Sequence, residues 1–137
     1  MTRIIIAGGR KFKNYDLLCL EMDKIILSLD LEKVEIVSGK ANGADTLGEK
    51  FAKSKGIKIV EFPAKWKDLE VENCIVGQNQ YGKYNKLAGH NRNKEMLEYA
   101  KTEDGILVAF WDGKSTGTKN MIEISNKAGL KVIVVKY

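Results

Sequence analysis

The segment RIIIAGG, residues 3–9, decides the fold, because a short apolar run rich in β-branched residues ends there at two glycines. An apolar run without alternation is typical of a strand buried on both faces, and glycines favour a turn beyond it. Comparable runs lie at residues 34–37, 57–62, 105–110 and 131–135. Between the runs, apolar residues at helical spacing predict helices over residues 14–29, 44–55, 92–101 and 115–128.

Strands that alternate with helices predict an α/β fold: a three-layer Rossmann-like domain with a mostly parallel sheet of about five strands. A length of 137 residues is that of one domain, so residues 1–137 are expected to form a single domain. Residues 65–89 break the alternation and are too long for a tight connection. This stretch holds Trp66, Tyr81 and Tyr84 around a polar centre, GQNQ at residues 77–80, and predicts either a flap over a site or a floppy insertion.

The composition excludes several classes of protein. Hydrophobic residues make up 44% and charged residues 30% of the chain, which is near the globular average and excludes a disordered or fibrous protein. No apolar run approaches the roughly 20 residues of a membrane span, and the first residues do not resemble a signal peptide. Cys19 and Cys74 lie far apart and predict neither a disulfide framework nor a metal site. We therefore expect a cytoplasmic protein with no metal, no cofactor and no membrane partner.

The charge balance permits an anionic partner. There are 23 basic and 18 acidic residues, a net charge of +5, which suits a nucleotide or a nucleic acid. Most of the basic residues are scattered lysines, a pattern more typical of solvated helix faces than of a nucleic-acid stripe. Arg10 and Arg92 stand beside glycine or asparagine in predicted loops, where a planar guanidinium suits a phosphate or carboxylate.

Four polar, glycine-containing loops, at residues 8–12, 38–45, 89–93 and 112–118, adjoin the predicted strands and helices. In an open parallel sheet, ligands bind beyond the carboxyl ends of the strands, near helix N-termini. Each loop alone is equally typical of a turn with a helix cap, but four at one sheet edge predict an anionic-ligand cleft. The candidate ligand-binding residues are Gly8, Gly9, Arg10, Ser38, Gly39, Gly43, Ala44, Asp45, Arg92, Asn93, Gly113, Ser115, Thr116, Gly117 and Thr118.

Several residues have a structural interpretation beside the functional one. Asp45 suits the N-terminus of a helix as well as a ligand contact. His90, the only histidine, is more typical of a loop or cap than of a general acid or base. Trp66 and Trp111 would stack on a base, although an aromatic residue beside a strand end more often belongs to the core.

Two common nucleotide motifs are excluded. GKS at residues 113–115 lacks the preceding glycine of a P-loop, since Val108 stands at that position. The loop after the first strand is not G-x-G-x-x-G, and the second strand ends in Val37-Ser38 rather than in an acid for a ribose hydroxyl. Neither ATP hydrolysis nor dinucleotide redox chemistry is expected.

Taken in order, the loops resemble a known family. The segments are IAGGRKF (6–12), SGKANGAD (38–45), PAKW (63–66), AGHNRNKEM (88–96) and the pair Gly117-Thr118. They resemble the YspA-type branch of the SLOG superfamily, which joins the Smf/DprA and LOG-like Rossmannoid proteins. The resemblance implies a Rossmannoid fold that binds a nucleotide or nucleotide-derived ligand, cyclic ones included. It also implies a bacterial or phage origin, and some relatives sense nucleotide signals in anti-phage defence or counter-defence.

LOG proteins cleave nucleoside 5′-monophosphates into a free base and ribose 5-phosphate. They use an arginine four residues before a methionine, and a glutamate three residues after the Gly-Thr of a G-G-x-G-T loop. Arg92 and Met96 match the first feature, whereas the loop is altered to KSTGT at residues 114–118 and Met121 replaces the glutamate. Glu123 lies about 200° around a helix from position 121, so we do not expect it to substitute.

The sequence therefore favours binding without cleavage and assigns no catalytic residue. The first hypothesis is a protein that senses or sequesters a nucleotide, with residues 65–89 closing over it. The alternative is a LOG-like phosphoribohydrolase. The third hypothesis is DprA-like nucleic-acid binding, which the scarcity of arginine disfavours. A homodimer or larger homo-oligomer is left open.

Overall fold

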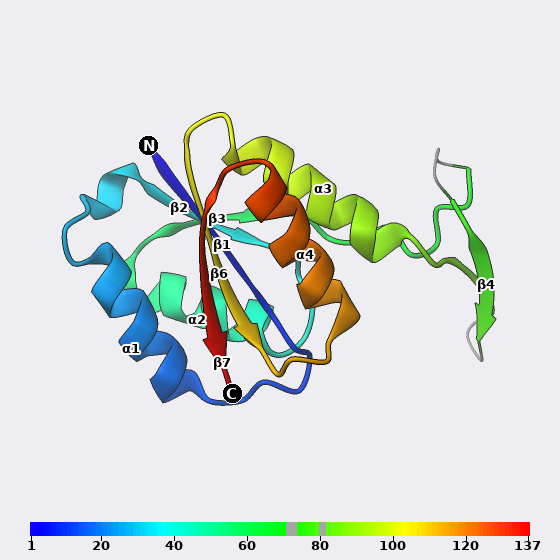
Figure 1. Cartoon of the computed structure of the whole chain (residues 1–137), viewed down its shortest axis with the longest axis horizontal. Helices are drawn as coiled ribbons and strands as arrows, with labels where there is room; N and C mark the ends of the chain where they lie inside the picture. The colour runs from blue at the N-terminus through cyan, green and yellow to red at the C-terminus, as the bar shows by residue number, and fades with distance from the viewer. Residues whose placement is uncertain (71–73, 80–81) are drawn as a thin grey trace.

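The computed structural model describes residues 1–70, 74–79 and 82–137. The larger of its two sheets has five parallel strands in the order β3-β2-β1-β6-β7 (Figure 1). The strands are β1 (Thr2–Gly8), β2 (Val34–Ser38), β3 (Lys58–Glu61), β6 (Asp104–Trp111) and β7 (Lys131–Lys136). The predicted Rossmann-like class and its parallel five-stranded sheet are confirmed.

Helices cover both faces of this sheet. They are α1 (Tyr15–Ile26), α2 (Ala44–Lys55), α3 (Ala88–Ala100) and α4 (Thr116–Lys127), with a short 3-10 turn at Leu31–Lys33. The Asn14 side chain caps α1 by accepting a hydrogen bond from the Leu17 amide at 3.0 Å. Gly56 ends α2 in the left-handed conformation, with φ of 69°. Three of the four helices therefore lie close to the ranges predicted from the sequence, and α3 is the exception.

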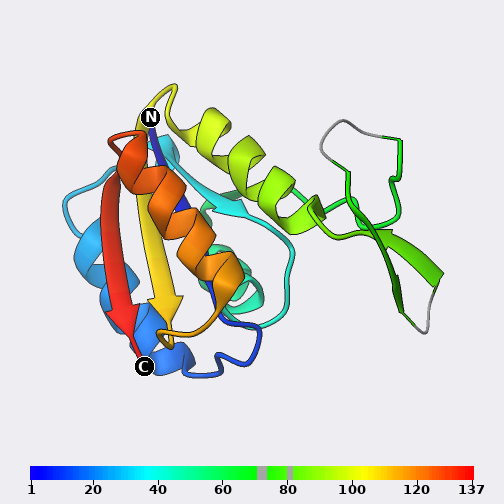
Figure 2. The same cartoon turned by 45° about the vertical axis from the view of Figure 1, so that its right-hand side comes forward.

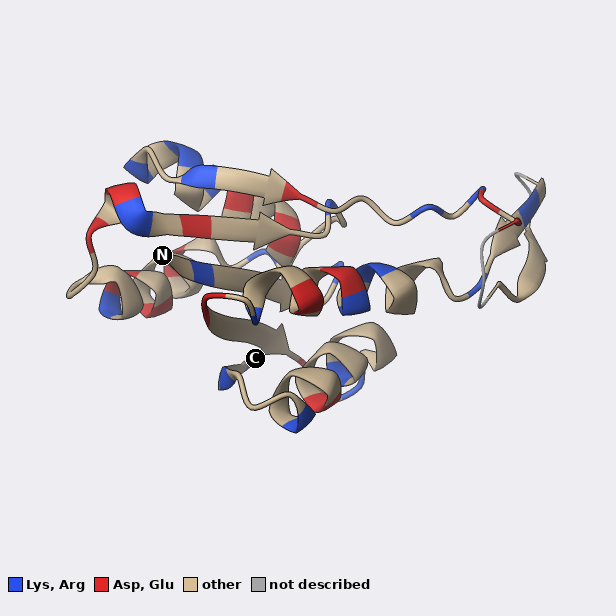
Figure 3. Cartoon of the chain, turned by 90° about the horizontal axis from the view of Figure 1, so that it is seen from above, with Lys and Arg blue, Asp and Glu red and all other residues tan. Residues whose placement is uncertain are grey.

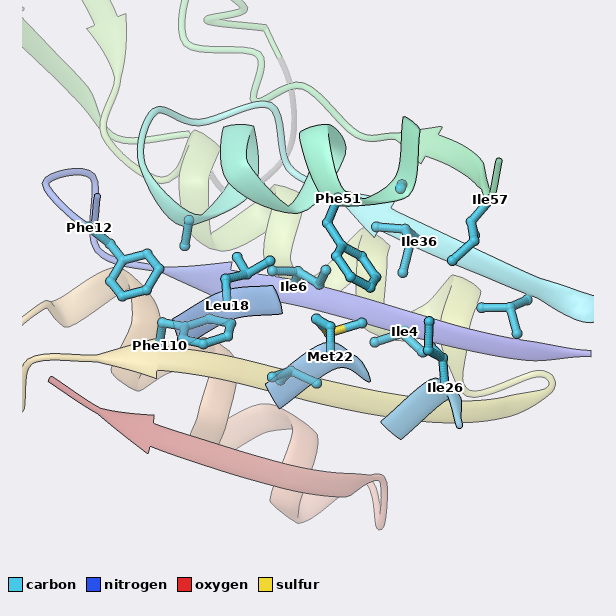
Figure 4. Close-up of a cluster of buried hydrophobic side chains, with 14 residues drawn as sticks. Ile4, Ile6, Phe12, Leu18, Met22, Ile26, Ile36, Phe51, Ile57 and Phe110 are labelled. Atoms are coloured by element: carbon cyan, nitrogen blue, oxygen red, sulfur yellow. The ribbon is translucent and has the colours of Figure 1, made fainter. Parts of the chain in front are cut away.

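The core lies on both sides of β1, because successive side chains of a strand point to opposite faces. Ile4 and Ile6 pack with residues of α1 and α2 in the cluster shown in Figure 4. Ile5 belongs to the second cluster, with residues of α3 and α4. Burying an aliphatic side chain of this size stabilises a fold by about 1.5–3 kcal/mol. The apolar run at residues 3–7 thus holds all three layers together.

Between β1 and β6, the order in which strands are added to the sheet reverses, and this reversal positions a crevice. β1 and β6 are hydrogen-bonded neighbours. The helix that follows β1 packs on one face, whereas the helix that follows β6 packs on the other. Such a switch in direction leaves an opening beyond the carboxyl ends of the two strands, where ligands of open α/β sheets bind.

The start of α3 differs from the prediction. The helix begins at Ala88, four residues before the predicted start at Arg92. The interpretation of Arg92 as a loop residue is therefore wrong, since it lies within the helix. Gly89, His90 and Asn91 are weak helix formers, so their intrinsic preference does not reveal the first turn. Ala88 is buried and Gly89 lies against the ring of Trp66, and this packing overrides the preference.

Residues 65–89 contain a hairpin of two antiparallel strands, β4 (Val76–Asn79) and β5 (Gly82–Asn85). The hairpin extends away from the larger sheet (Figures 1 and 2). Buried Asn85 fixes its base by accepting hydrogen bonds from the amides of Ile75, at 3.3 Å, and Leu87, at 3.0 Å. Gln80 and Tyr81, which the sequence placed in this segment, lie outside the described residues.

Lysines, arginines and acidic residues are mixed along the helices (Figure 3). In the described ranges, no helix combines the length and the apolar character needed to cross a membrane.

Candidate functional site

A cavity of about 460 Å³ lies beyond the carboxyl ends of β1 and β6. Its walls come from the loops after β1 and β6, the start of α2, the base of the hairpin, the first turns of α3 and α4, and Tyr137. Ten of the predicted residues line it: Gly8, Gly9, Arg10, Asp45, Arg92, Asn93, Ser115, Thr116, Gly117 and Thr118. Gly39 lines a neighbouring cavity of about 260 Å³. Ser38, Gly43, Ala44 and Gly113 are not walls of either one.

Gly43 and Ala44 bring the loops after β1 and β2 together. Gly43 has a φ of 80°, and a Cβ there would lie 2.2 Å from the Gly9 carbonyl oxygen. The Ala44 amide donates to the same oxygen at 3.3 Å. Only glycine permits both this conformation and this approach. These two predicted residues therefore position the cavity wall rather than form it.

Ser38 anchors the loop after β2 through hydrogen bonds of its side chain. Its buried hydroxyl donates to Glu49 Oε2 at 2.7 Å and accepts a hydrogen bond from the Lys40 amide at 3.2 Å. Lys40 Nζ lies 2.9 Å from Glu49 Oε1 and 3.4 Å from Glu61 Oε1. Lys40 itself has a φ of 59°, unusual for a residue other than glycine. The cluster fixes the loop that carries Gly39 and Ala41.

Arg92 reaches across the sheet edge from α3 to this loop. Its Nη1 donates to the Gly39 carbonyl oxygen at 2.5 Å, and its Nε donates to Asn93 Oδ1 at 3.1 Å. A Cβ at position 39 would lie 2.7 Å from Arg92 Nη1, so a larger residue there would displace the Arg92 side chain from this position. Burial lowers the pKa of the Arg92 guanidinium, while the charge of Asp45 acts in the opposite direction.

Asp45 is a buried carboxyl group in the cavity wall. Its Oδ2 accepts a hydrogen bond from the Ala41 amide at 3.2 Å. Burial raises the pKa of Asp45 to about 6, against the lowering effects of the Ala41 amide and of Arg92. The side chain thus binds a loop amide at the start of α2 and also faces the cavity, while its contact with a ligand stays a prediction.

Trp66 is a wall of the cavity and belongs to neither core cluster. The preferred interpretation of this residue as core is therefore wrong. The Arg10 guanidinium lies 5.6 Å from the centre of its ring, and the Tyr84 ring meets it edge-on at 6.4 Å. Trp111, by contrast, donates from Nε1 to the Ser115 carbonyl oxygen at 3.0 Å and is not a wall.

The N-terminus of α4 opens into the cavity. Its N-cap residue, Ser115, makes no side-chain cap hydrogen bond, and its Oγ lies 3.1 Å from Thr118 Oγ1. Asn93 joins the two helices, because its Nδ2 donates to the Gly117 carbonyl oxygen at 3.1 Å. The amides and the dipole of a first helical turn favour an anion. Asp112 accepts from the amides of Ser115 and Lys114, which lowers the pKa of its carboxyl group.

Further walls of the cavity were not among the predicted binding residues. The set includes Lys86, His90, Met96, Met121 and Tyr137. The sequence carries no local signal for Tyr137, whose ring packs 4.7 Å from that of Phe12. Met121 is fully buried, whereas Glu123 is exposed and lies 3.8 Å from Lys119 Nζ. The carboxylate at position 123 therefore stands away from the cavity.

In the part of the chain that the structure describes, no group of three or more histidine, cysteine, aspartate or glutamate side chains is arranged to hold a metal ion.

Comparison with known proteins relates this geometry to a family. The structure is similar to that of DNA processing protein A (DprA) from Streptococcus pneumoniae, with a TM-score of 0.50 and 17% sequence identity. The match covers 97% of this chain and 58% of the DprA chain, and at this identity it establishes the fold alone. No curated protein matches the sequence. Residues 2–68, which include the loops after β1 and β2 and Trp66, match the family model described as "YspA, cpYpsA-related SLOG family". This segment therefore belongs to the SLOG family that the loops of the sequence resemble.

Proposed function

We propose that the larger cavity binds a nucleotide or nucleotide-derived ligand, and that the protein senses or sequesters this ligand. The SLOG family and the Rossmann-like fold support a role in binding a nucleotide or a nucleic acid. The observation that carries the proposal is the convergence of Arg10, Arg92 and the first turn of α4 on one cavity. Three positive features from separate elements, facing one space, suit a phosphate-bearing ligand.

The walls of the cavity suit the rest of a nucleotide as well. Trp66, Met96 and Tyr137 offer apolar and aromatic surface beside the positive groups. Small-molecule sites combine such surface with a few convergent polar groups, within about 300–1,000 Å³. The volume of about 460 Å³ lies within that range.

Binding without cleavage is favoured by the residue at position 121. LOG-like cleavage needs a carboxylate there to stabilise an oxocarbenium-like transition state, and the cavity has the thioether of Met121 instead. Asp45 and Asp112 are the carboxyl groups among the cavity walls. Each already binds backbone amides. We therefore propose that the bound nucleotide keeps its glycosidic bond.

The test is to incubate the purified protein with a pool of mono-, di- and cyclic nucleotides, separate bound from free by ultrafiltration, and identify both fractions by mass spectrometry. An intact nucleotide retained with the protein supports the proposal. A free base in the filtrate would instead identify a phosphoribohydrolase. A pool that passes through unretained and unchanged would reject nucleotide binding at this cavity.

A further inference from the structure

Two cavities in this structure share one wall. The smaller cavity, of about 260 Å³, adjoins the larger one, and four residues line both: Arg10, Ala41, Trp66 and Arg92. Its remaining walls come from the loop after β2 and from the segment after β3: Gly39, Lys40, Asn42, Pro63 and Ala64. A ligand in the larger cavity that extends past Arg10 and Arg92 therefore enters the smaller one.

The shared wall carries two guanidinium groups, those of Arg10 and Arg92, and the Asp45 carboxyl group acts on Arg92 from the larger cavity. Arg10 and Arg92 are close enough for the charge of Arg10 to act on that of Arg92. The hydrogen bonds of Arg92 go to uncharged oxygens, the Gly39 carbonyl and Asn93 Oδ1. The Arg10 guanidinium lies over an aromatic ring. Because two neighbouring guanidinium groups repel each other, an anion with more than one negative charge would be strongly favoured here.

The smaller cavity suits a polar group with apolar faces. Trp66 and Pro63 provide ring surfaces, and Asn42 provides a polar side chain. The Ser38–Lys40–Glu49 cluster holds this loop in place, so the cavity is built into the fold. A sugar or a second nucleoside has this combination of polar edges and apolar faces.

We infer that the smaller cavity is a second subsite, and that the ligand is a nucleoside diphosphate with a sugar or second nucleoside on its distal phosphate. The diphosphate lies at the wall formed by Arg10 and Arg92, with one end of the ligand in each cavity. This inference rests on the proposed function, because it assumes that the larger cavity binds a nucleotide.

The experiment compares AMP, ADP and ADP-ribose by isothermal titration calorimetry on the full chain. Ala64→Trp fills the smaller cavity from a position that does not line the larger one. Ala128→Trp, at an exposed site after α4, is the control of matched size. Thermal unfolding of each variant checks that it folds, and Ala64→Leu is the milder substitute.

For the wild type and Ala128→Trp, we expect ADP-ribose to bind about tenfold or more tightly than AMP. In Ala64→Trp, we expect that preference to fall to within about twofold, through loss of affinity for ADP-ribose. Equal affinity for AMP and ADP-ribose in the wild type would overturn the inference and leave the proposed function standing. So would ADP binding as tightly as ADP-ribose, or an unchanged preference in folded Ala64→Trp and Ala64→Leu. If none of the three compounds binds while the pool experiment retains another nucleotide, the inference fails for ADP-ribose and the proposed function stands. If the pool also passes through unretained, the proposed function fails together with the inference.

Discussion

We expect ligand binding to depend most on Arg92. We expect Arg92→Ala to weaken nucleotide binding by about 10- to 100-fold, because a hydrogen bond to a charged group contributes about 1.5–3 kcal/mol. Arg92→Lys should recover only part of this loss, since an ammonium lacks the planar fork. Calorimetry with the nucleotide that the pool experiment identifies measures the affinity of both variants.

Lys94→Ala is the control for Arg92, because Lys94 is exposed on the same helix and lines neither cavity. Its affinity should remain within about twofold of the wild type. Arg92 also binds the Gly39 carbonyl oxygen, so the unfolding midpoint of each variant is measured in parallel. A folded Arg92→Ala protein with wild-type affinity would contradict the assignment.

Asp45 should make stability depend on pH. Its pKa is raised by burial from 3.8 to about 6, so the folded state binds the proton more tightly than the unfolded state does. Stability is therefore lost as the pH rises from about 4 to about 6, and the loss stays constant above that range. A shift of about two units corresponds to roughly 3 kcal/mol.

Asp45→Asn removes this titration and keeps an oxygen for the Ala41 amide. Relative to the wild type, its free energy of unfolding should rise by roughly 3 kcal/mol between pH 4 and pH 7, measured by urea denaturation at each pH. A difference that stays constant across this range would show that Asp45 ionises normally in the folded protein.

At the scale of elements, the base of the hairpin contributes to the cavity, whereas β4 and β5 extend away from it (Figure 2). We expect a short glycine linker in place of residues 76–84 to change nucleotide affinity by less than about threefold. Trp66→Ala, at the base, should weaken binding by about tenfold, because stacking on an aromatic side chain contributes about 1–3 kcal/mol per base. Fluorescence-detected or calorimetric titration of both variants tests this difference. A large loss of affinity in the linker variant would show that the hairpin closes over the ligand.

The sequence predicts best those strands and helices that are marked by a local pattern of residues. β1 and β6 were predicted because a continuous apolar run is needed in a strand covered on both faces. α2 was predicted with its exact end because Gly56 adopts the left-handed cap. The first turn of α3 was missed because packing on Trp66, which is distant in sequence, stabilises it. Tyr137 was missed for the same reason: only the folded sheet brings it against Phe12.

At the scale of the whole molecule, the net charge of +5 does not by itself make a nucleic-acid surface. Positive and negative residues are mixed along the helices (Figure 3). We therefore expect weak binding to single-stranded DNA even at low salt. Fluorescence anisotropy over a range of salt concentrations measures it. Tight binding would instead support the DprA-like hypothesis if the logarithm of the binding constant falls against the logarithm of the salt concentration with a slope of about −0.7 per phosphate contact.

The positions of the two tryptophans have a practical consequence. Trp66 lies in the wall shared by both cavities, whereas Trp111 is anchored to the backbone of Ser115 beside them. The chain has no other tryptophan, so its tryptophan emission arises from Trp66 in the cavity wall and from Trp111. A base that stacks on Trp66 would quench that emission while Trp111 supplies a constant background. The protein is thus its own optical sensor of occupancy, and the chain with Trp66→Phe is the blank for that signal.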